Sequence, residues 1–222
     1  MSDPTIVALP TPGSTGPPPL RSPLAGTLDA LGAITAVEGS AVLTRSFGDP
    51  DGEAAAIASA LGVADVTVRA KIDLRGNVDD AYAGSDGDVW ARIANGWALV
   101  FAPPGPVDDR VAAMAERGGP STMVTDATHL LAGLALAGPH VPEAVARVSS
   151  WDPATLAPDA ATGAPIADVR AIVLRRDTNV PILELYVAME SARYAWRSVL
   201  EVVTELGGRA VGWDALRAHG WR

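Results

Sequence analysis

The sequence contains no cysteine, and this excludes disulfide bonds, thiolate zinc sites, iron–sulfur ligation and a cysteine nucleophile. Basic residues are also scarce: 17 Lys and Arg stand against 26 Asp and Glu, giving a net charge of −9. This charge repels phosphate backbones and anionic lipids, so we expect neither nucleic acid nor a membrane as partner. No apolar run reaches the roughly 20 residues that span a bilayer, and no secretory signal is apparent. A cytoplasmic location is therefore predicted.

Sequence patterns that hold common cofactors are missing as well. The three histidines, His129, His140 and His219, share no ligand spacing, so no metal centre is expected. The GxGxxG fingerprint is absent, which argues against flavin or another dinucleotide in this chain. What the sequence does have is 222 residues with 48% hydrophobic content, enough for one sizeable domain or two small ones.

The chain opens on a segment of different composition. Residues 1–23 are rich in Pro, Gly, Ser and Thr and cannot bury enough apolar surface to offset the entropy of ordering. We expect a disordered arm there. Its other interpretation is an extended segment that lies across a partner subunit.

Hydrophobic periodicity predicts an alternation of helices and strands after the arm. Helices are expected at residues 24–31, 53–61, 107–117, 141–148 and 190–206, and strands at 66–74, 90–93, 97–101, 122–126, 131–137, 169–174 and 182–187. Asn95-Gly96 predicts the tight turn of a hairpin. The polar segment 76–88 is too broken for a good helix. Strand 66–74 alternates at period two, with Asp73 and Arg75 facing away from its apolar side.

Four segments occur in an order that resembles a known family. ILELYV at 182–187 is followed by a helix containing YAWRSVL and by GGRAVGWDALR at 207–217. Upstream lie LGVADVT leading into KIDLRG, and VTD followed by LALAGP. This order is similar to the folate-binding domain of glycine cleavage T proteins, and more closely to the short gamma subunit of heterotetrameric sarcosine oxidase, with its FELYV strand and closing glycine corner. The resemblance covers about residues 62–217.

The resemblance implies an α+β fold of two duplicated ferredoxin-like, split βαβ halves. We place these halves at residues 24–120 and 121–222. Folate is held near the pseudo-twofold centre in such a fold, so the resemblance implies that any binding would be centred on the strands at 71–75 and 170–186.

The family's reactive aspartate marks a first departure. In the family it follows an RG pair, on a helix near the reactive nitrogen of tetrahydrofolate, where a carboxylate stabilises developing positive charge. This sequence has no such helix. The candidates in the corresponding region are Asp79, Asp80, Asp86 and Asp88, whose alternative interpretation is a set of solvated loop carboxylates.

A second departure concerns the glutamate with which the family clamps the pterin. Counting back from the ELYV motif, this glutamate falls on Val180, which cannot accept a hydrogen bond. Asp177 is the nearest carboxylate. Glu184 matches a later glutamate of the motif, and we interpret it as an outward residue of its strand. With Tyr186 and Arg75, these residues are the candidates for weak tetrahydrofolate binding.

Three functions remain open. The first is a sarcosine oxidase gamma-like accessory subunit, non-catalytic or weakly folate-binding, with flavin in another chain and other subunits as partners. This prediction is supported by the stop at Arg222, where the transferases continue into a further barrel, and it places an exposed apolar patch at Trp213, Leu216 and Trp221. The second is a stand-alone tetrahydrofolate-dependent methyl or aminomethyltransferase. The third is a folate-sensing or structural protein.

Overall fold

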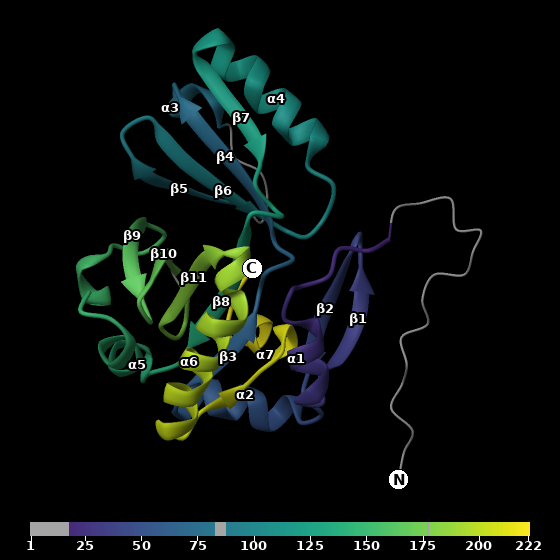
Figure 1. Ribbon diagram of the computed structural model, residues 1–222, viewed down its shortest axis with the longest axis vertical. Helices are drawn as coiled ribbons and strands as arrows, with labels where there is room; N and C mark the ends of the chain where they lie inside the picture. Colours follow the sequence, from purple (N-terminus) through teal and green to yellow (C-terminus); the bar gives the residue numbers. More distant parts are fainter. Residues whose placement is uncertain (1–17, 83–87, 177) are drawn as a thin grey trace.

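The computed structural model describes residues 18–82, 88–176 and 178–222 of the chain (Figure 1). Most of the predicted arm, residues 1–17, therefore lies outside the described residues. Helices and strands alternate along the described chain, and its strands form three sheets of two, four and six strands.

The largest sheet has six strands, in the order β12-β3-β8-β11-β10-β9. Only β12 and β3 pair in parallel; the other neighbours are antiparallel. In this order the strands are Arg209–Ala210, Gly62–Asp65, Leu131–Ala137, Ile182–Ala188, Val169–Arg176 and Ala161–Ile166. The predicted strands 131–137, 169–174 and 182–187 are thus confirmed, and β9 is a strand that the sequence analysis missed.

A separate four-stranded antiparallel sheet has the order β5-β6-β4-β7. Its strands are Val89–Ala94, Trp97–Ala102, Ala70–Gly76 and Thr122–Asp126. The predicted Asn95-Gly96 hairpin is confirmed between β5 and β6, with Gly96 at φ 65°. Helices α3 (Val78–Ala81) and α4 (Asp108–Gly118) cover one face of this sheet. The single turn α3 corrects the expectation that 76–88 holds no helix.

The N-terminal part adds a hairpin that the sequence analysis did not predict. It consists of β1 (Ile34–Glu38) and β2 (Ala41–Ser46), joined by Gly39-Ser40. Helix α1 (Ala25–Ala30) precedes it, and α2 (Pro50–Ser59) follows. Helix α2 starts before the predicted residue 53, because Asp49 accepts a hydrogen bond from the Gly52 amide at 3.1 Å and Pro50 is the first helical residue.

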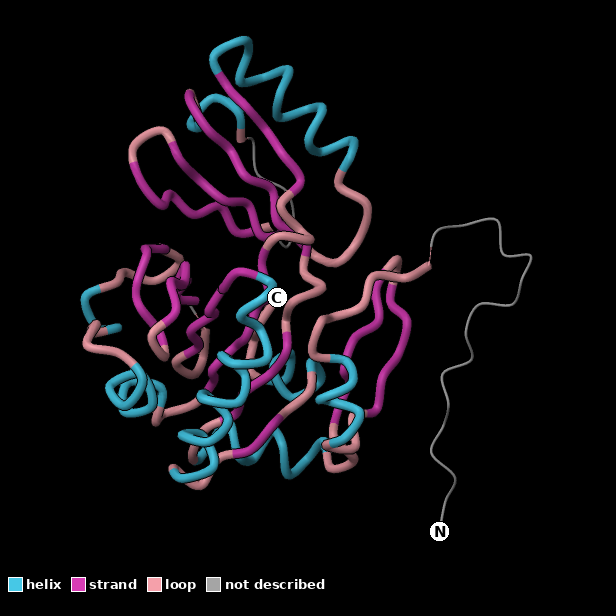
Figure 2. The backbone as a smooth tube through the Cα atoms, in the orientation of Figure 1, coloured by secondary structure: helices cyan, strands magenta, loops and turns pink. Residues whose placement is uncertain are grey.

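The remaining helices are α5 (Val141–Val148), α6 (Ala192–Glu205) and α7 (Trp213–Ala218). Side chains from α1, α5 and α6 form one core with one face of the six-stranded sheet. Side chains from β2, α2, α7 and the end of the chain form a second core with its other face. Figure 2 shows the helices lying around this sheet and the four-stranded sheet above it. The six-stranded sheet is therefore covered on both faces.

The predicted strand 66–74 is wrong as a single element. The chain leaves the six-stranded sheet after Asp65, turns through residues 67–69, and enters the four-stranded sheet at Ala70. The Asp65 carboxylate accepts a hydrogen bond from the Thr67 amide at 3.0 Å, a local bond that favours a turn. Beyond the turn the predicted alternation holds, since Ile72 and Leu74 lie in the apolar core of the four-stranded sheet.

The two large sheets meet through a cluster that includes Leu99 and Phe101 of β6, and Leu174 and Tyr186 of the six-stranded sheet. The rings of Phe101 and Tyr186 stack with their centroids 4.4 Å apart. The face of β11 that carries Tyr186 is therefore covered by the four-stranded sheet. The division at residue 120 into two halves stays a prediction; β7, beyond it, pairs with β4, and β3, before it, pairs with β8.

Gly212, in the glycine-containing segment at 207–217, allows its backbone to lie close to that of Arg45. A Cβ on Gly212 would lie 2.0 Å from the carbonyl oxygen of Arg45, so no larger residue fits there. The Gly212 amide donates to Glu53 at 2.7 Å, and Glu53 also accepts from the Phe47 amide at 2.6 Å. This corner directs α7 and the last residues of the described chain back under the six-stranded sheet.

Candidate functional site

The centre of the candidate site is Glu184, on strand β11. Side chains alternate along this strand, and Leu183 and Leu185 enter the core beneath α5 and α6. Glu184 and Tyr186 point to the opposite face, where the four-stranded sheet and the end of the chain cover them. Glu184 is 0% exposed. The interpretation of Glu184 as an outward residue is therefore wrong, because a second layer lies over this face of the sheet.

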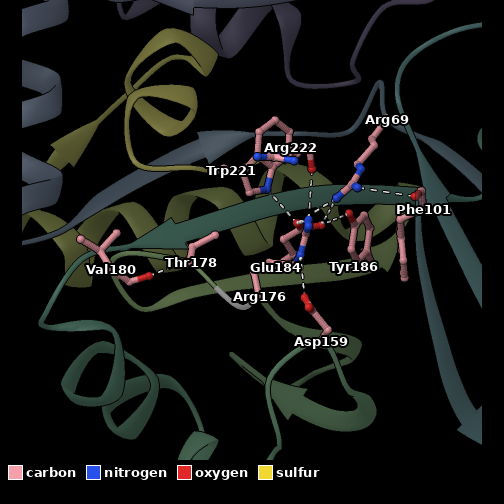
Figure 3. Close-up of polar contacts among 10 residues, drawn as sticks. All are labelled: Arg69, Phe101, Asp159, Arg176, Thr178, Val180, Glu184, Tyr186, Trp221 and Arg222. Atoms are coloured by element: carbon pink, nitrogen blue, oxygen red, sulfur yellow. Dashed lines mark hydrogen bonds and ion pairs between the residues drawn. The ribbon is translucent and has the colours of Figure 1, made fainter. Parts of the chain in front are cut away.

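Four side chains donate hydrogen bonds to the Glu184 carboxylate (Figure 3). Oε1 accepts from Arg69 Nη1 at 2.9 Å, from Arg176 Nη1 at 2.7 Å and from Trp221 Nε1 at 2.7 Å. Oε2 accepts from Arg69 Nη1 at 3.0 Å and from the Tyr186 hydroxyl. These donors come from the β3–β4 turn, β10, β11 and the end of the chain. We call these five residues the Glu184 centre.

The charges of the Glu184 centre decide its ionisation. Burial by itself raises the pKa of Glu184, but the attraction of Arg69 and Arg176 and the hydrogen bond from Tyr186 outweigh it, and the pKa is lowered. Burial raises the pKa of Tyr186 well above its usual 10, so this residue is a neutral donor. The Glu184 carboxylate thus faces two guanidinium groups, and that of Arg176 also pairs with the exposed carboxylate of Asp159, 3.4 Å away.

Packing fixes the aromatic members of the centre. The Trp221 ring lies edge-on to Trp213, with centroids 4.8 Å apart, and beneath the guanidinium of Arg69 at 5.3 Å. Tyr186 is paired across the sheet with Gly133, where a Cβ would lie 2.8 Å from its ring. Glycine at 133 therefore gives Tyr186 the room to reach Glu184.

Lys71 is a buried basic residue next to the centre, with its Nζ 6.0 Å from the Tyr186 ring centroid. Its Nζ donates to the carbonyl oxygens of Thr67, Thr128 and Leu131 at 2.6, 3.1 and 2.9 Å. Burial lowers the pKa of Lys71 to about 7, against the opposing attraction of Asp65. The lysine thus ties the turn between the two sheets to the start of β8.

Of the residues proposed for folate contact, only Tyr186 lies beside Glu184 among those that the structure describes. Arg75 lies on β4, 45% exposed; its Nε donates to Asp73 at 2.9 Å and its guanidinium covers the Trp97 ring at 4.0 Å. Val180, at the position of the pterin clamp, is half-buried against the core that contains α7. Asp177 lies outside the described residues.

The candidate catalytic aspartates differ in their surroundings. Asp79 and Asp80 lie on α3 and interact with Arg92 and Asn77. Asp88 precedes β5, and its side chain is 1% exposed; its Oδ1 accepts from Arg110 at 2.5 Å, and its buried Oδ2 has no hydrogen-bond partner among the described residues. Asp86 lies outside the described residues.

The apolar patch expected at the end of the chain is not exposed. Trp213, Leu216 and Trp221 are 2%, 0% and 3% exposed, because they pack beneath β2, β3 and β8. The prediction that they meet a partner is therefore wrong. Within the described ranges, no three metal-ligating side chains gather, and no helix has the length and apolarity to cross a membrane.

Sequence reasoning missed Arg69, Arg176 and Trp221 as members of the centre. A signal was present: Arg69 lies within a run in which every second residue is apolar, and Glu184 interrupts the apolar run 182–187. A strand that is apolar on both sides is covered on both faces, and a charge within it needs a buried partner of opposite sign. The pairing of Arg69 with Glu184 follows from that rule once both runs are placed in adjoining layers.

No family model and no curated protein matches the sequence. Among solved structures, the chain is similar to glycine cleavage system aminomethyltransferase T from Bartonella henselae, with a TM-score of 0.74 and 17% identity over 88% of this chain. The match takes in 60% of the aminomethyltransferase, so this chain spans less than two thirds of that protein's length. It is also similar to a chain of heterotetrameric sarcosine oxidase from Corynebacterium sp. U-96, with a TM-score of 0.58 and 14% identity, over 74% of this chain and 96% of the other.

These likenesses confirm the fold class expected from the sequence. Identities of 17% and 14% establish a shared fold and leave activity, ligands and partners to the residues of this chain. The chain has the α+β architecture of the glycine cleavage T folate-binding domain.

Proposed function

We propose that this chain is an accessory subunit, non-catalytic or only weakly tetrahydrofolate-binding, of a complex that oxidatively demethylates small amines. Flavin lies in another chain of that complex. The proposal is supported by the likeness to a chain of a heterotetrameric sarcosine oxidase, which is matched over 96% of its length.

The observation that carries the proposal is that side chains of this chain already bind the Glu184 carboxylate. Four side chains of the chain itself donate hydrogen bonds to the two oxygens of the buried carboxylate, and the sequence resemblance assigns the position of the family's pterin clamp to Val180. Among the residues described here, the candidate folate contacts thus offer no buried, free acceptor for the pterin N–H groups. An unpaired pterin N–H group costs about 1–3 kcal/mol on burial. We therefore infer that folate binding by this chain is absent or weak.

A stand-alone tetrahydrofolate-dependent transferase is the second candidate, favoured by one observation. The Asp88 carboxylate is buried, and within the part of the chain that the structure describes one of its oxygens has no hydrogen-bond partner. A buried carboxylate with a free oxygen is the kind of group that can stabilise positive charge developing on a substrate. If the chain transfers a methyl or aminomethyl group by itself, Asp88→Asn will lower kcat with little effect on KM. Asp79→Asn is the matched control, because Asp79 is 65% exposed.

Co-purification from the native host tests the proposal. An accessory subunit will elute in a stoichiometric complex that contains flavin and other chains, and the complex will oxidise sarcosine or a related amine. A chain that elutes alone and turns over a methyl donor with tetrahydrofolate contradicts the proposal and supports the transferase. A chain that elutes alone without activity contradicts it too, and supports a free-standing folate-sensing or structural protein.

A further inference from the structure

An open groove of about 1050 Å³ runs between helices α1 and α6, on the side of the molecule away from the Glu184 centre. Its α1 wall includes Ala30 and Leu31, of which Leu31 is 45% exposed. Its α6 wall includes Trp196 and Leu200. Small and apolar side chains thus form a helix-sized groove that the rest of the described chain does not fill.

The charged residues along the α6 wall follow a regular order. Arg193 and Arg197 lie in the first half of the helix, and Glu201 and Glu205 lie in the second half. A spacing of four places all of them along one stripe of the helix, over a length of about 18 Å. Within the described ranges the side chains of Arg193, Arg197 and Glu201 have no ion-pair partner, whereas Glu205 pairs with Arg147 at 3.0 Å.

The charges of this stripe are complementary to those of a second copy of α6 that runs in the opposite direction. Arg197 and Glu201 lie equally far from position 199, and so do Arg193 and Glu205. A second α6, packed antiparallel with its midpoint at the same level, therefore places Glu201 of the second copy beside Arg197, and the reciprocal pair forms by symmetry. Leu200 lies next to the symmetry axis, where it meets its counterpart.

We propose that this face is the interface of a symmetric homodimer, in which α6 of each copy lies antiparallel in the groove of the other. The small α1 residues allow the close approach, Leu200 supplies a central apolar contact, and the Arg and Glu pairs fix the direction of the helices. An unrelated partner of one charge sign would pair either with the two arginines or with the two glutamates of the stripe, but not with both. The inference does not rest on the accessory-subunit proposal, because it concerns the purified chain alone.

Charge reversal tests the pairing directly. In Arg197→Glu the stripe places acidic residues opposite each other, and in Glu201→Arg it places basic residues opposite each other. We expect the wild-type chain to sediment as a dimer and each variant to dimerise at least about 10-fold more weakly. An equimolar mixture of the two variants will form a heterodimer, and the double variant Arg197→Glu/Glu201→Arg will recover the homodimer. Arg170→Glu, exposed on β10, is the matched control and will leave the dimer unchanged.

Sedimentation equilibrium at low and high salt measures these constants, and circular dichroism checks that each variant is folded. The variants are at exposed positions, so folding is expected to be retained. A wild-type chain that stays monomeric at about 100 µM contradicts the proposal. The proposal is also contradicted if neither single charge reversal changes the dissociation constant of the dimer, or if the two variants do not associate when mixed.

Discussion

Nη1 of Arg69 lies 2.9 Å from one carboxylate oxygen of Glu184 and 3.0 Å from the other, in a site that solvent does not reach. Arg69 belongs to the turn between the two large sheets, and Glu184 belongs to the centre of the six-stranded sheet. The ion pair therefore joins the two layers. Its first consequence is for stability.

Replacing Glu184 by Gln will destabilise the protein by about 3–5 kcal/mol. The substitution keeps the size of the side chain but leaves the buried guanidinium group of Arg69 without a counter-charge, and it leaves Arg176 with only the exposed carboxylate of Asp159, 3.4 Å away. Urea unfolding at pH 7 measures the loss. Glu143→Gln is the control, because Glu143 pairs with Arg147 at 50% exposure and its loss will cost no more than about 1 kcal/mol. An equal loss of unfolding free energy in the two variants would contradict this account.

Truncation of Trp221 to Ala will destabilise the fold by about 3–5 kcal/mol rather than act on partner binding alone. The indole fills a buried position against Trp213 and donates to Glu184. Trp221→Phe keeps most of the packing and loses the donor, so its cost will be about 1–3 kcal/mol. Thermal unfolding measures both, with Leu130→Ala, at a 62% exposed position, as control. A Trp221→Ala chain as stable as the control would show that this residue is exposed in solution.

Stability will rise with pH because of Lys71. Burial lowers the pKa of folded Lys71 to about 7, and an unfolded lysine has a pKa of about 10.4. Between these values the unfolded chain binds a proton that the folded chain does not, so the free energy of unfolding increases, by up to about 1.4 kcal/mol per pH unit. From pH 7.5 to 9.5 the wild type will therefore gain roughly 2–3 kcal/mol relative to Lys71→Met. Parallel curves for the two proteins would mean that folded Lys71 keeps its proton.

Gly133→Ala will disturb the Glu184 centre through Tyr186. The added methyl group would lie 2.8 Å from the tyrosine ring and 3.1 Å from a methyl group of Val66, both buried. Such overpacking costs typically 1–3 kcal/mol. In Tyr186→Leu the ring is absent, so adding Gly133→Ala to that variant will cost less than it does in the wild type. Equal costs in the two backgrounds, measured by urea unfolding, would argue against the contact.

Much of the local structure was predictable from the sequence. The hairpin at Asn95-Gly96 and helices α4, α5 and α6 follow from turn chemistry and from apolar spacing. The hairpin of β1 and β2 also carried a signal, because Gly39-Ser40 separates two short runs that contain Ile, Val and Thr. Strand β9 was harder to predict because Gly163 and Pro165 interrupt it, and its place at the edge of the sheet is what tolerates the proline.

The site was less predictable because its residues meet only through tertiary packing. Local alternation suggests that Glu184 faces outward, and nothing local shows that a second sheet and Trp221 cover it. The turn at residues 67–69 had the same effect, since it moves Arg69 from an apparent strand into the space between two sheets. Burial of Trp213 and Trp221 likewise depends on the close approach at Gly212.

Calorimetric titration of the purified chain with tetrahydrofolate tests the central claim most directly. If the chain's own side chains fill the Glu184 centre, binding will be absent or weaker than about 1 µM. A dissociation constant below that value, lost in Asp177→Asn or Glu184→Gln variants that remain folded, would show that the centre opens to hold folate and would contradict this account.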